Sequence, residues 1–392
     1  MSLSSPVADG IHAMVPSDAM HPSARKLRDT YAMKPGAPLL RVEFGFMEGT
    51  LENWREQGMP DESQTPRNEL FLLDPPGGHG LAGLGWCEAA FVPDWPTTVL
   101  EDRGEYELVQ DFAGRHVLYF KGRRQGFMPE YVDHPVKDMR SWQEQAKPRL
   151  DPATPERWAD FDQRMTRAVA AAQQGMVITQ HLAGAGMYLR GMIGPEGWLL
   201  AFYDHPDMVH DCMRTWFNLA DAVIARHQQH VTLDEIFFAE DICYNHGSLI
   251  GHDTLKEFVF PYYQQLIANL RTRQIDRSRH LYVQIDTDGD CRPTIPWFAD
   301  ALGMDVMSPF EVASGCDVVP IARDHPHLVI RGGIDKRVLA QGRHAIDRML
   351  NRILPAMRQR GGYIPCCDHA VPNEVPYADY LHYRQRCAEL GG

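Results

Sequence analysis

The sequence predicts an α/β protein built on a parallel TIM (β/α)8 barrel, with an N-terminal extension and an antiparallel insertion. From residue 155 onward, short apolar runs alternate with longer amphipathic segments, which is typical of parallel strands joined by right-handed helical crossovers. The 392 residues are enough for a barrel of about 250 residues with additions. An open, doubly wound sheet is the alternative. Its dinucleotide-binding form is disfavoured, because no Gly-x-Gly-x-x-Gly opens a helix after the first strand.

The first part of the chain is expected to hold the N-terminal extension. Residues 1–24 are rich in Ser, Pro and Ala and predict a flexible arm. The remaining residues, 25–392, are expected to form a single barrel domain. Within it, residues 39–46 are predicted to form a strand, and a helical pattern follows through Trp54.

Residues 71–150 differ in pattern and are interpreted as an antiparallel insertion or lid within that domain. Two short alternating runs, at residues 105–112 and 116–121, are joined through Gly114 and predict a β-hairpin. Aromatic side chains of this stretch could close over the barrel mouth, although packing is their more common role. They are Trp86, Trp95, Phe120 and Tyr131.

Six further apolar runs predict the strands of the barrel, and the strand at residues 39–46 brings the number close to eight. The runs are residues 176–182, 235–239, 281–285, 305–307, 328–331 and 363–365. The longest helical patterns lie at residues 206–227, 253–273 and 336–359. Pro261 is expected to end or kink the second of these helices.

Composition and charge exclude several classes of function. The 39 basic and 52 acidic residues give a net charge of −13 without a basic patch, which argues against nucleic-acid binding. No apolar stretch reaches the roughly 18 residues that a membrane span needs. The eight scattered cysteines indicate reduced thiols, and the N-terminus does not resemble a secretory signal. We therefore expect a cytoplasmic protein, with an enzyme as the default for this size.

Ionisable side chains follow each of the six predicted strands. The carboxyl ends of the strands of a parallel barrel meet at one mouth, where the catalytic groups of such folds lie. Any single loop often begins with a charged residue, but six in succession predict an active site. The residues are His181, Glu240, Asp241, Asp286, Asp288, Glu311, Asp335, Lys336, Cys366, Cys367, Asp368 and His369.

The Asp286-x-Asp288 pair, followed by Gly289, is the sharpest local feature. Two carboxylates supply hard oxygen ligands for a divalent cation. The segment does not match the twelve-residue calcium loop, and a simple turn built on Asp and Gly is an equal alternative. Cys367 and His369 are also able to ligate a metal, although adjacent cysteines rarely bind one ion together.

The run from Arg331 to Arg337 contains two glycines and several positive charges just before a predicted helix. Its backbone amides and cations could receive an anionic group. The structural alternative is a tight turn in which Asp335 caps the helix, and the two interpretations are compatible.

Several ordered motifs resemble the uroporphyrinogen decarboxylase superfamily. They are Glu240-Asp-Ile-Cys-Tyr244, Phe258-Val-Phe-Pro-Tyr-Tyr263, Phe310-Glu-Val-Ala-Ser-Gly-Cys-Asp317, Gly332-Gly-Ile-Asp-Lys-Arg337, Gly361-Gly-Tyr-Ile-Pro365, Asp368-His369 and Val375-Pro376. The resemblance covers residues 160–385 well and the first third of the chain loosely. It implies a TIM barrel, in agreement with the strand pattern, and also a homodimer.

The superfamily that the chain resembles holds two chemistries. Its decarboxylases are cofactor-free and bind the carboxylates of a tetrapyrrole through an Arg-Gln-Ala-Gly-Arg segment after the first strand. Residues 43–48 stand at that place here and contain two glutamates and no arginine, the wrong sign for a polycarboxylate. Its corrinoid-dependent methyltransferases hold zinc, a Lewis acid, through a His-x-Cys pair and a late Cys. Asp286-x-Asp288 resembles the first of these positions and His369 the second.

The resemblance therefore favours a methyltransferase-type enzyme. It would demethylate a small methoxy or methylamine compound and pass the methyl group to a corrinoid protein or another carrier. The resemblance implies three sets of site residues. The metal ligands, for zinc or a harder divalent ion, would be Asp286, Asp288, Cys367 and His369. The catalytic groups would be Asp286, Asp288, His369, Glu240 and Asp241. Substrate would be bound by Tyr244, Arg331, Asp335, Lys336, Glu311 and His181.

Two alternatives remain open at this point. One is a carboxy-lyase of the same superfamily, acting on a small carboxylate or a tetrapyrrole, in which a cation anchors the leaving carboxylate and an acid protonates the carbon. The other is a non-catalytic barrel that binds a tetrapyrrole or corrinoid. The sequence lacks the Asp-x-His-x-x-Gly signature of corrinoid-binding domains, so a corrinoid would arrive on a partner protein.

Overall fold

The computed structural model describes residues 20–122 and 129–392. Residues 1–19, most of the predicted arm, lie outside the described residues. The predicted boundary at residue 24 falls inside helix α1, Pro22–Tyr31, in which Ser23 and Ala24 are buried. Ala24 belongs to an apolar cluster with Val177 of the barrel, so this helix packs on the barrel.

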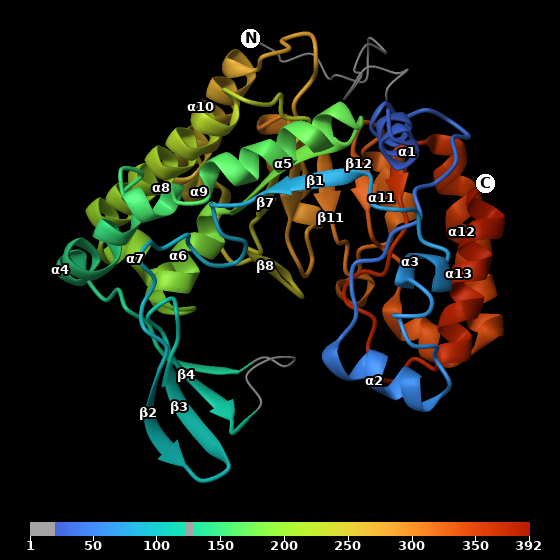
Figure 1. The fold of residues 1–392 in the computed structure, drawn as a ribbon, viewed down its shortest axis with the longest axis horizontal. Coiled ribbons are helices and arrows are strands. Elements are labelled where there is room, and N and C mark those ends of the chain that lie inside the picture. Colours follow the sequence, from blue (N-terminus) through green and yellow to red (C-terminus); the bar gives the residue numbers. More distant parts are fainter. Residues whose placement is uncertain (1–19, 123–128) are drawn as a thin grey trace.

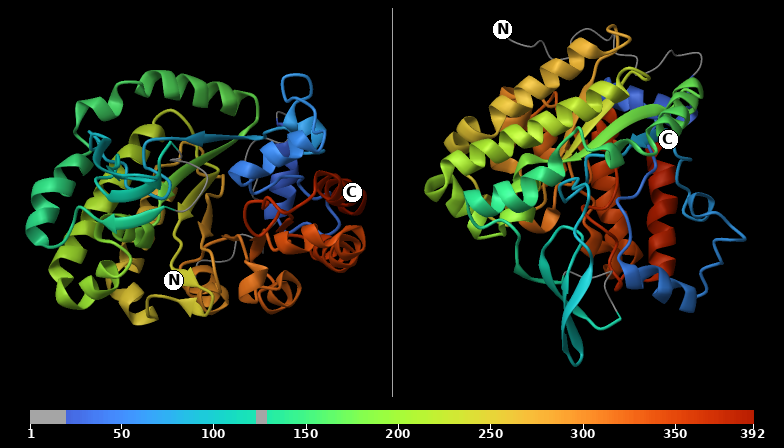
Figure 2. Two further views of the ribbon diagram at one scale, coloured as in Figure 1. Left: turned by 90° about the horizontal axis from the view of Figure 1, so that it is seen from below. Right: turned by 60° about the vertical axis from the view of Figure 1, so that its left-hand side comes forward.

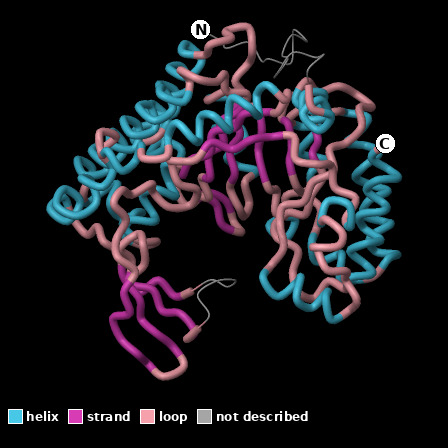
Figure 3. The backbone as a smooth tube through the Cα atoms, viewed as in Figure 1, coloured by secondary structure: helices cyan, strands magenta, loops and turns pink. Residues whose placement is uncertain are grey.

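Seven parallel strands form one curled sheet within the described residues, surrounded by helices (Figures 1 and 3). In spatial order they are β1 (Gly78–Leu81), β6 (Val177–Ala183), β7 (Glu235–Ala239), β10 (Tyr282–Asp286), β11 (Val306–Ser308), β12 (Val329–Arg331) and β13 (Tyr363–Ile364). Six of the seven match the predicted runs to within one residue at each end. The prediction of a parallel α/β sheet is thereby confirmed. The edge strands β1 and β13 do not pair with each other, so a closed (β/α)8 barrel is not formed by these strands.

The predicted strand at residues 39–46 was wrong, because only Phe46 forms a β-bridge, to Val371. The other backbone groups find different partners. The Arg41 N–H donates to Asp74 Oδ2 at 2.8 Å, and the Arg384 guanidinium donates to the Val42 carbonyl at 3.1 Å. Since side chains satisfy these groups, they are not available to a strand ladder.

The same segment fills the space between the two edges of the sheet. Asp74, just before β1, accepts from Arg41, whereas the Cys367 N–H, just after β13, donates to the Glu43 carboxylate at 2.8 Å. The segment therefore stands where an eighth strand would close the barrel. It does so with side-chain contacts, isolated backbone hydrogen bonds and the single bridge from Phe46 to Val371, instead of a continuous strand ladder.

Residues 71–150 supply a barrel strand as well as the predicted antiparallel insertion. β1 was missed because its sequence, Gly-His-Gly-Leu, follows Pro-Pro-Gly and is typical of a turn. The predicted hairpin is confirmed within a four-stranded antiparallel sheet. Its strands are β2 (Thr98–Arg103), β3 (Tyr106–Gln110), β4 (His116–Phe120) and β5 (Glu130–Asp133). Figure 1 shows this sheet projecting from the body of the molecule on the side where β8 (Cys243–Tyr244) lies.

Helices cover the outside of the curled sheet (Figure 2). Those not yet given are α2 (Glu48–Glu56), α3 (Arg67–Leu70), α4 (Met139–Ser141), α5 (Phe161–Gln173), α6 (Ala185–Ile193), α7 (Gly197–Asp204), α8 (Pro206–His227), α9 (His252–Phe258), α10 (Phe260–Arg273), α11 (Val318–Asp324), α12 (Arg343–Arg360) and α13 (Tyr377–Gly391). The break between α9 and α10 lies just before Pro261, as predicted. None of the helices in the described part of the chain is long and apolar enough to cross a membrane.

Candidate active site

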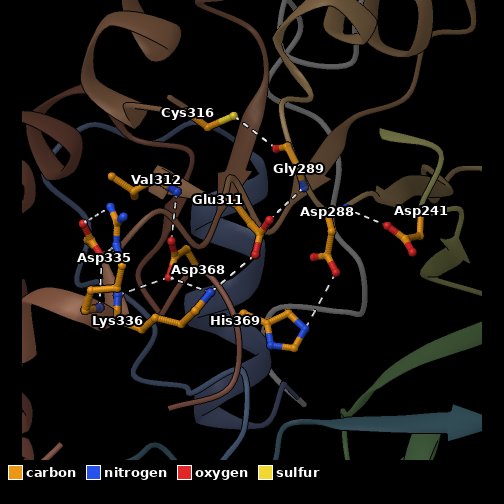
Figure 4. Close-up of polar contacts among 11 residues, drawn as sticks. Asp241, Asp288, Gly289, Glu311, Val312, Cys316, Asp335, Lys336, Asp368 and His369 are labelled. Atoms are coloured by element: carbon orange, nitrogen blue, oxygen red, sulfur yellow. Dashed lines mark hydrogen bonds and ion pairs between the residues drawn. The ribbon is translucent and has the colours of Figure 1, made fainter. Parts of the chain in front are cut away.

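Side chains from five neighbouring strand ends meet at the carboxyl end of the sheet (Figure 4). We call six of them the mouth cluster: Asp241 after β7, Asp288 after β10, Glu311 after β11, Lys336 after β12, and Asp368 and His369 after β13. These residues are far apart in sequence, and the parallel topology alone brings them together. All six come from the predicted strand ends.

Asp288 faces His369 across the mouth, with 3.7 Å between Asp288 Oδ2 and His369 Nε2 (Figure 4). The other carboxyl oxygen, Oδ1, is buried and has no hydrogen-bond partner among the described residues. Burial, with the charges of Asp241, Asp286 and Glu311, raises the pKa of Asp288 to about 8. Asp288 therefore holds a proton at neutral pH and can donate it.

Burial and the nearby Lys336 ammonium lower the pKa of His369. The imidazole is therefore neutral at pH 7 and can accept a proton on one ring nitrogen while it donates from the other. Its ring also lies 4.8 Å from that of Phe44. Together, Asp288 and His369 form a pair that can deliver and recover a proton.

Lys336 is held between two carboxylates of the mouth. Its Nζ lies 3.4 Å from Glu311 Oε1 and 3.6 Å from Asp368 Oδ1. Asp368 is almost fully buried and also accepts from the Val312 and Lys336 N–H groups at 2.9 and 3.1 Å. Glu311 accepts from the Gly289 N–H at 3.0 Å. This network fixes the loops that carry Asp288 and His369.

Asp241 is the acid nearest to Asp288 on the other side. One of its oxygens accepts from the Arg190 guanidinium at 2.6 Å, and the other accepts from the Asp288 N–H at 3.3 Å. Asp241 itself has a φ of 37°, an unfavourable value that these contacts hold in place. Arg190 comes from α6 and gave no signal in the sequence, because it does not follow a strand.

Glycine is required at position 289 because the backbone of Tyr244 passes close to it. Gly289 has a φ of 75°, and a Cβ there would lie 2.6 Å from the Tyr244 carbonyl oxygen. That carbonyl accepts from the Asp290 N–H at 2.8 Å. The Tyr244 side chain is 45% exposed, so the residue lies at the rim of the site.

Asp286 lies deeper than the mouth cluster, at the last position of β10. Its carboxylate contacts the Ser308 hydroxyl, which also accepts from Gln284 Nε2 at 3.0 Å. Burial raises the pKa of Asp286 to about 6. It raises the pKa of Asp288 electrostatically, but the two carboxyls have separate partners.

Glu240 does not face the mouth cluster. Its carboxylate accepts from the Gly186 N–H at 2.7 Å and contacts the Tyr263 hydroxyl, so it joins the start of α6 to α10. Burial raises its pKa to about 7. The structure thus gives Glu240 a packing position behind Asp241, although both were predicted as catalytic.

Asp335 also has a structural place. Its side chain accepts from the Arg337 N–H at 3.0 Å and pairs with the Arg337 guanidinium at 2.8 Å. It therefore caps the short 3-10 turn Lys336–Gln341, as the structural alternative had it.

His181 and Arg331 lie inside the sheet and line a cavity of about 300 Å³ with Glu235 and Tyr31. Gly80 of β1 makes room for the histidine, since a Cβ there would lie 3.1 Å from His181 Cε1. The structure therefore separates these two predicted substrate-binding residues from the mouth cluster.

Comparison with known proteins identifies the family. Residues 155–389, more than half of the chain, match the family described as uroporphyrinogen decarboxylase. The chain belongs to the uroporphyrinogen decarboxylase family. No curated protein matches it.

Solved structures share the fold of this family member. A methyltransferase from Methanosarcina mazei superposes with a TM-score of 0.56 at 14% identity, over 93% of this chain and 97% of that chain. Xylanase B from Clostridium stercorarium F9 gives 0.31 at 11% identity, over 54% and 72%. A psychrophilic family 10 endo-β-1,4-xylanase gives 0.34 at 9% identity, over 58% and 81%. The first of these supports the barrel-like fold.

The zinc site that the family resemblance implied does not fit these residues. Cys367 is fully buried within the main apolar cluster, and burial raises the pKa of its thiol well above the usual value. Asp286 is engaged by Ser308, away from the Asp288–His369 pair. Across residues 20–122 and 129–392, no group of three or more His, Cys, Asp and Glu side chains is arranged to hold a metal ion.

Trp86 is the second residue near the site whose place the sequence did not reveal. It follows β1, and its ring stacks on Phe237 of β7 at 4.8 Å and meets His181 edge-on at 5.4 Å. The sequence pattern predicted it as an aromatic of the insertion. Its contacts instead make it part of the barrel interior, while 49% of the residue remains exposed.

Proposed function

We propose that this uroporphyrinogen decarboxylase family member is a methyltransferase-type enzyme. It demethylates a small methoxy or methylamine compound at the mouth cluster and passes the methyl group to a corrinoid protein or another carrier. The observation that carries the proposal is the buried Asp288 carboxyl, 3.7 Å from His369, in a mouth whose cations Lys336 and Arg190 are already paired. The raised pKa of Asp288 supports it.

Proton delivery is what demethylation of an ether requires of the protein. When the bond between the methyl carbon and an ether oxygen breaks, the oxygen leaves with the electron pair and needs a proton, whereas a cationic amine leaves as the neutral amine and needs none. Asp288 supplies the proton from its carboxyl oxygen. His369, 3.7 Å away, then passes a proton to Asp288 from one ring nitrogen while the other ring nitrogen takes a proton from solvent. The methyl carbon bonds to the nucleophile of the carrier, so atoms and charge balance.

The acidic character of the mouth cluster supports demethylation over tetrapyrrole decarboxylation. A polycarboxylate needs several free cations, whereas Lys336 lies between Glu311 and Asp368, and Arg190 pairs with Asp241. Glu43, at the place of the decarboxylase arginines, pairs with Arg384 of α13 at 3.6 Å. A neutral ether or a cationic amine fits an acidic mouth better.

The proposal predicts demethylation that depends on Asp288. The purified chain is incubated with a panel of methoxyaromatic and methylamine donors and a corrinoid acceptor, and the demethylated product is measured by mass spectrometry. Asp288→Asn should lower kcat by about 100-fold or more, the range of a lost general acid. Asp253→Asn, at a fully exposed aspartate of α9, is the matched control and should leave the rate unchanged. Turnover that survives Asp288→Asn would contradict the proposed role.

A carboxy-lyase is the second candidate, because Arg331 could hold a carboxylate inside the barrel. The same assay separates the two candidates, since a lyase would release carbon dioxide without a methyl acceptor. By analogy with the family, we also propose a cytoplasmic homodimer. Gel filtration coupled to light scattering tests the homodimer.

A further inference from the structure

The cavity inside the barrel has one polar wall and one apolar wall. It opens between the sheet edges, beside α1 and the segment before β1. Arg331, His181 and Tyr31 supply polar groups, whereas Leu40 and Ile364 supply apolar surface. Its volume of about 300 Å³ is at the lower end of small-molecule sites, which suits a ligand with a single ring.

Arg331 carries a charge that no neighbour at contact distance neutralises. It ends β12, opposite Ile364 of β13. None of the ion pairs formed among the described residues, all within 4.0 Å, includes it. Burial opposes the charge on Arg331, but Cys366, Tyr31, Glu235 and Asp286 outweigh burial and raise its pKa. Arg331 therefore stays protonated in an environment of low dielectric constant.

Two carboxyls, Glu235 and Asp286, act on this charge from beyond ion-pair distance, and Arg331 in turn favours their ionised forms. Asp286 is engaged by the Ser308 hydroxyl. Asp74 already pairs with Lys26 at 2.8 Å and with Arg41 at 3.1 Å. The nearest group to Glu235 is the Tyr31 hydroxyl, and burial raises the pKa of Glu235, which favours its neutral form. Burial lowers the pKa values of the two lining histidines, His79 and His181, so both are neutral at pH 7.

We propose that this cavity binds a small carboxylate with an apolar body. The carboxylate pairs with the Arg331 guanidinium, and the body packs between Leu40, Val177 and Ile364. A planar guanidinium matches a carboxylate in geometry. A cation inside the barrel that forms no ion pair within 4.0 Å among the described residues gains more from pairing than one in open solvent does. The inference does not depend on methyl transfer, and it deepens the second candidate function by naming the cavity and the class of ligand that Arg331 would hold.

Isothermal titration calorimetry of the full chain with benzoate tests the proposal. Benzoate should bind in the millimolar range or tighter, and benzamide, which has the same shape without the charge, at least tenfold more weakly. Arg331→Gln should weaken benzoate by at least tenfold and leave benzamide unchanged, whereas Arg331→Lys should retain part of the affinity. A failure of these results would leave the demethylation assay unaffected, so the two proposals fail separately.

Two further variants keep the test decisive. Leu40→Trp fills the cavity and should abolish binding of both probes with Arg331 intact, so it also serves if Arg331→Gln does not fold by circular dichroism. Lys336→Gln changes the cation of the mouth cluster and should leave benzoate affinity unchanged. No benzoate binding to the unaltered chain, equal binding to Arg331→Gln, or loss in Lys336→Gln alone would overturn the proposal.

Discussion

Asp288 makes both stability and activity fall as pH rises. Its pKa of about 8 in the folded chain lies well above the value near 4 of an exposed aspartate. The folded chain therefore holds a proton that the unfolded chain releases. The resulting stability is fully present below about pH 4 and is lost as pH rises to about 8. A general acid with this pKa also loses activity as pH rises past 8.

Asp288→Asn cannot ionise and should therefore melt at a higher temperature than the unaltered chain at pH 9. We expect a gain of about 1–3 °C, reduced because the carboxyl is 37% exposed, and a smaller gain at pH 5. Differential scanning calorimetry across this pH range measures the gain. If Asp288→Asn and the unaltered chain melt at the same temperature at pH 5 and also at pH 9, Asp288 is ionised at neutral pH.

The candidate residues could be predicted from sequence, but the directions in which their side chains point could not. Asp241 and Glu240 are neighbours after β7, yet one reaches the mouth and the other packs beneath α6. Adjacent residues after a strand face opposite sides, and the loop path decides which side is the mouth. Arg190 was missed for a related reason, since its position on a helix face carries no mark of the strand end that it supports.

At the scale of elements, Asp74 holds the segment at residues 39–46 in place of an eighth strand. Burial disfavours its charge, but hydrogen bonds from Lys26 and Arg41 outweigh burial and lower its pKa. Asp74→Asn should lower the free energy of unfolding by about 1–3 kcal/mol, the cost of weakening a buried charged hydrogen bond. Urea denaturation measures the change, with Asp253→Asn as the exposed control.

The pH dependence of this loss has a definite sign. The pKa of Asp74 is lowered in the folded chain. The stability that the ionised carboxylate contributes is therefore present above about pH 4 and is lost as pH falls through the folded-state pKa. The difference between the unaltered chain and Asp74→Asn should therefore narrow below pH 4. A constant difference would show that the aspartate acts through shape alone.

The elements that the sequence did predict are those with long or regular apolar patterns. α8 has the predicted bounds, Pro206–His227, because its apolar positions recur at helical spacing over 22 residues. β1 has four residues, two of them glycine, and becomes a strand only through pairing with β6. The segment at residues 39–46 shows the opposite case. Its sequence has a strand-like pattern, but its backbone groups bond to side chains instead of to a neighbouring strand.

For the whole molecule, the antiparallel insertion is expected to be separable from the barrel fold but not from its function. The family match begins at residue 155, after the insertion. Val109 and Val117, both fully buried, are cross-strand partners within the insertion, so its strands pack largely on each other. Two contacts join it to the preceding loop. The Trp95 backbone N–H donates to the Phe112 carbonyl at 2.9 Å, and the Arg115 guanidinium pairs with the Glu88 carboxylate at 3.1 Å.

Replacing residues 98–133 by a short Gly-Ser linker should therefore leave one cooperative unfolding transition, with the melting temperature lowered by about 2–4 °C for about 1 kcal/mol of lost contacts. If the insertion covers the mouth during turnover, the same variant should raise KM about tenfold and change kcat less, because a lid contributes to substrate retention. Calorimetry and steady-state kinetics on one preparation measure both effects. Loss of the cooperative transition would make the insertion part of the folding unit, and unchanged KM would remove it from the site.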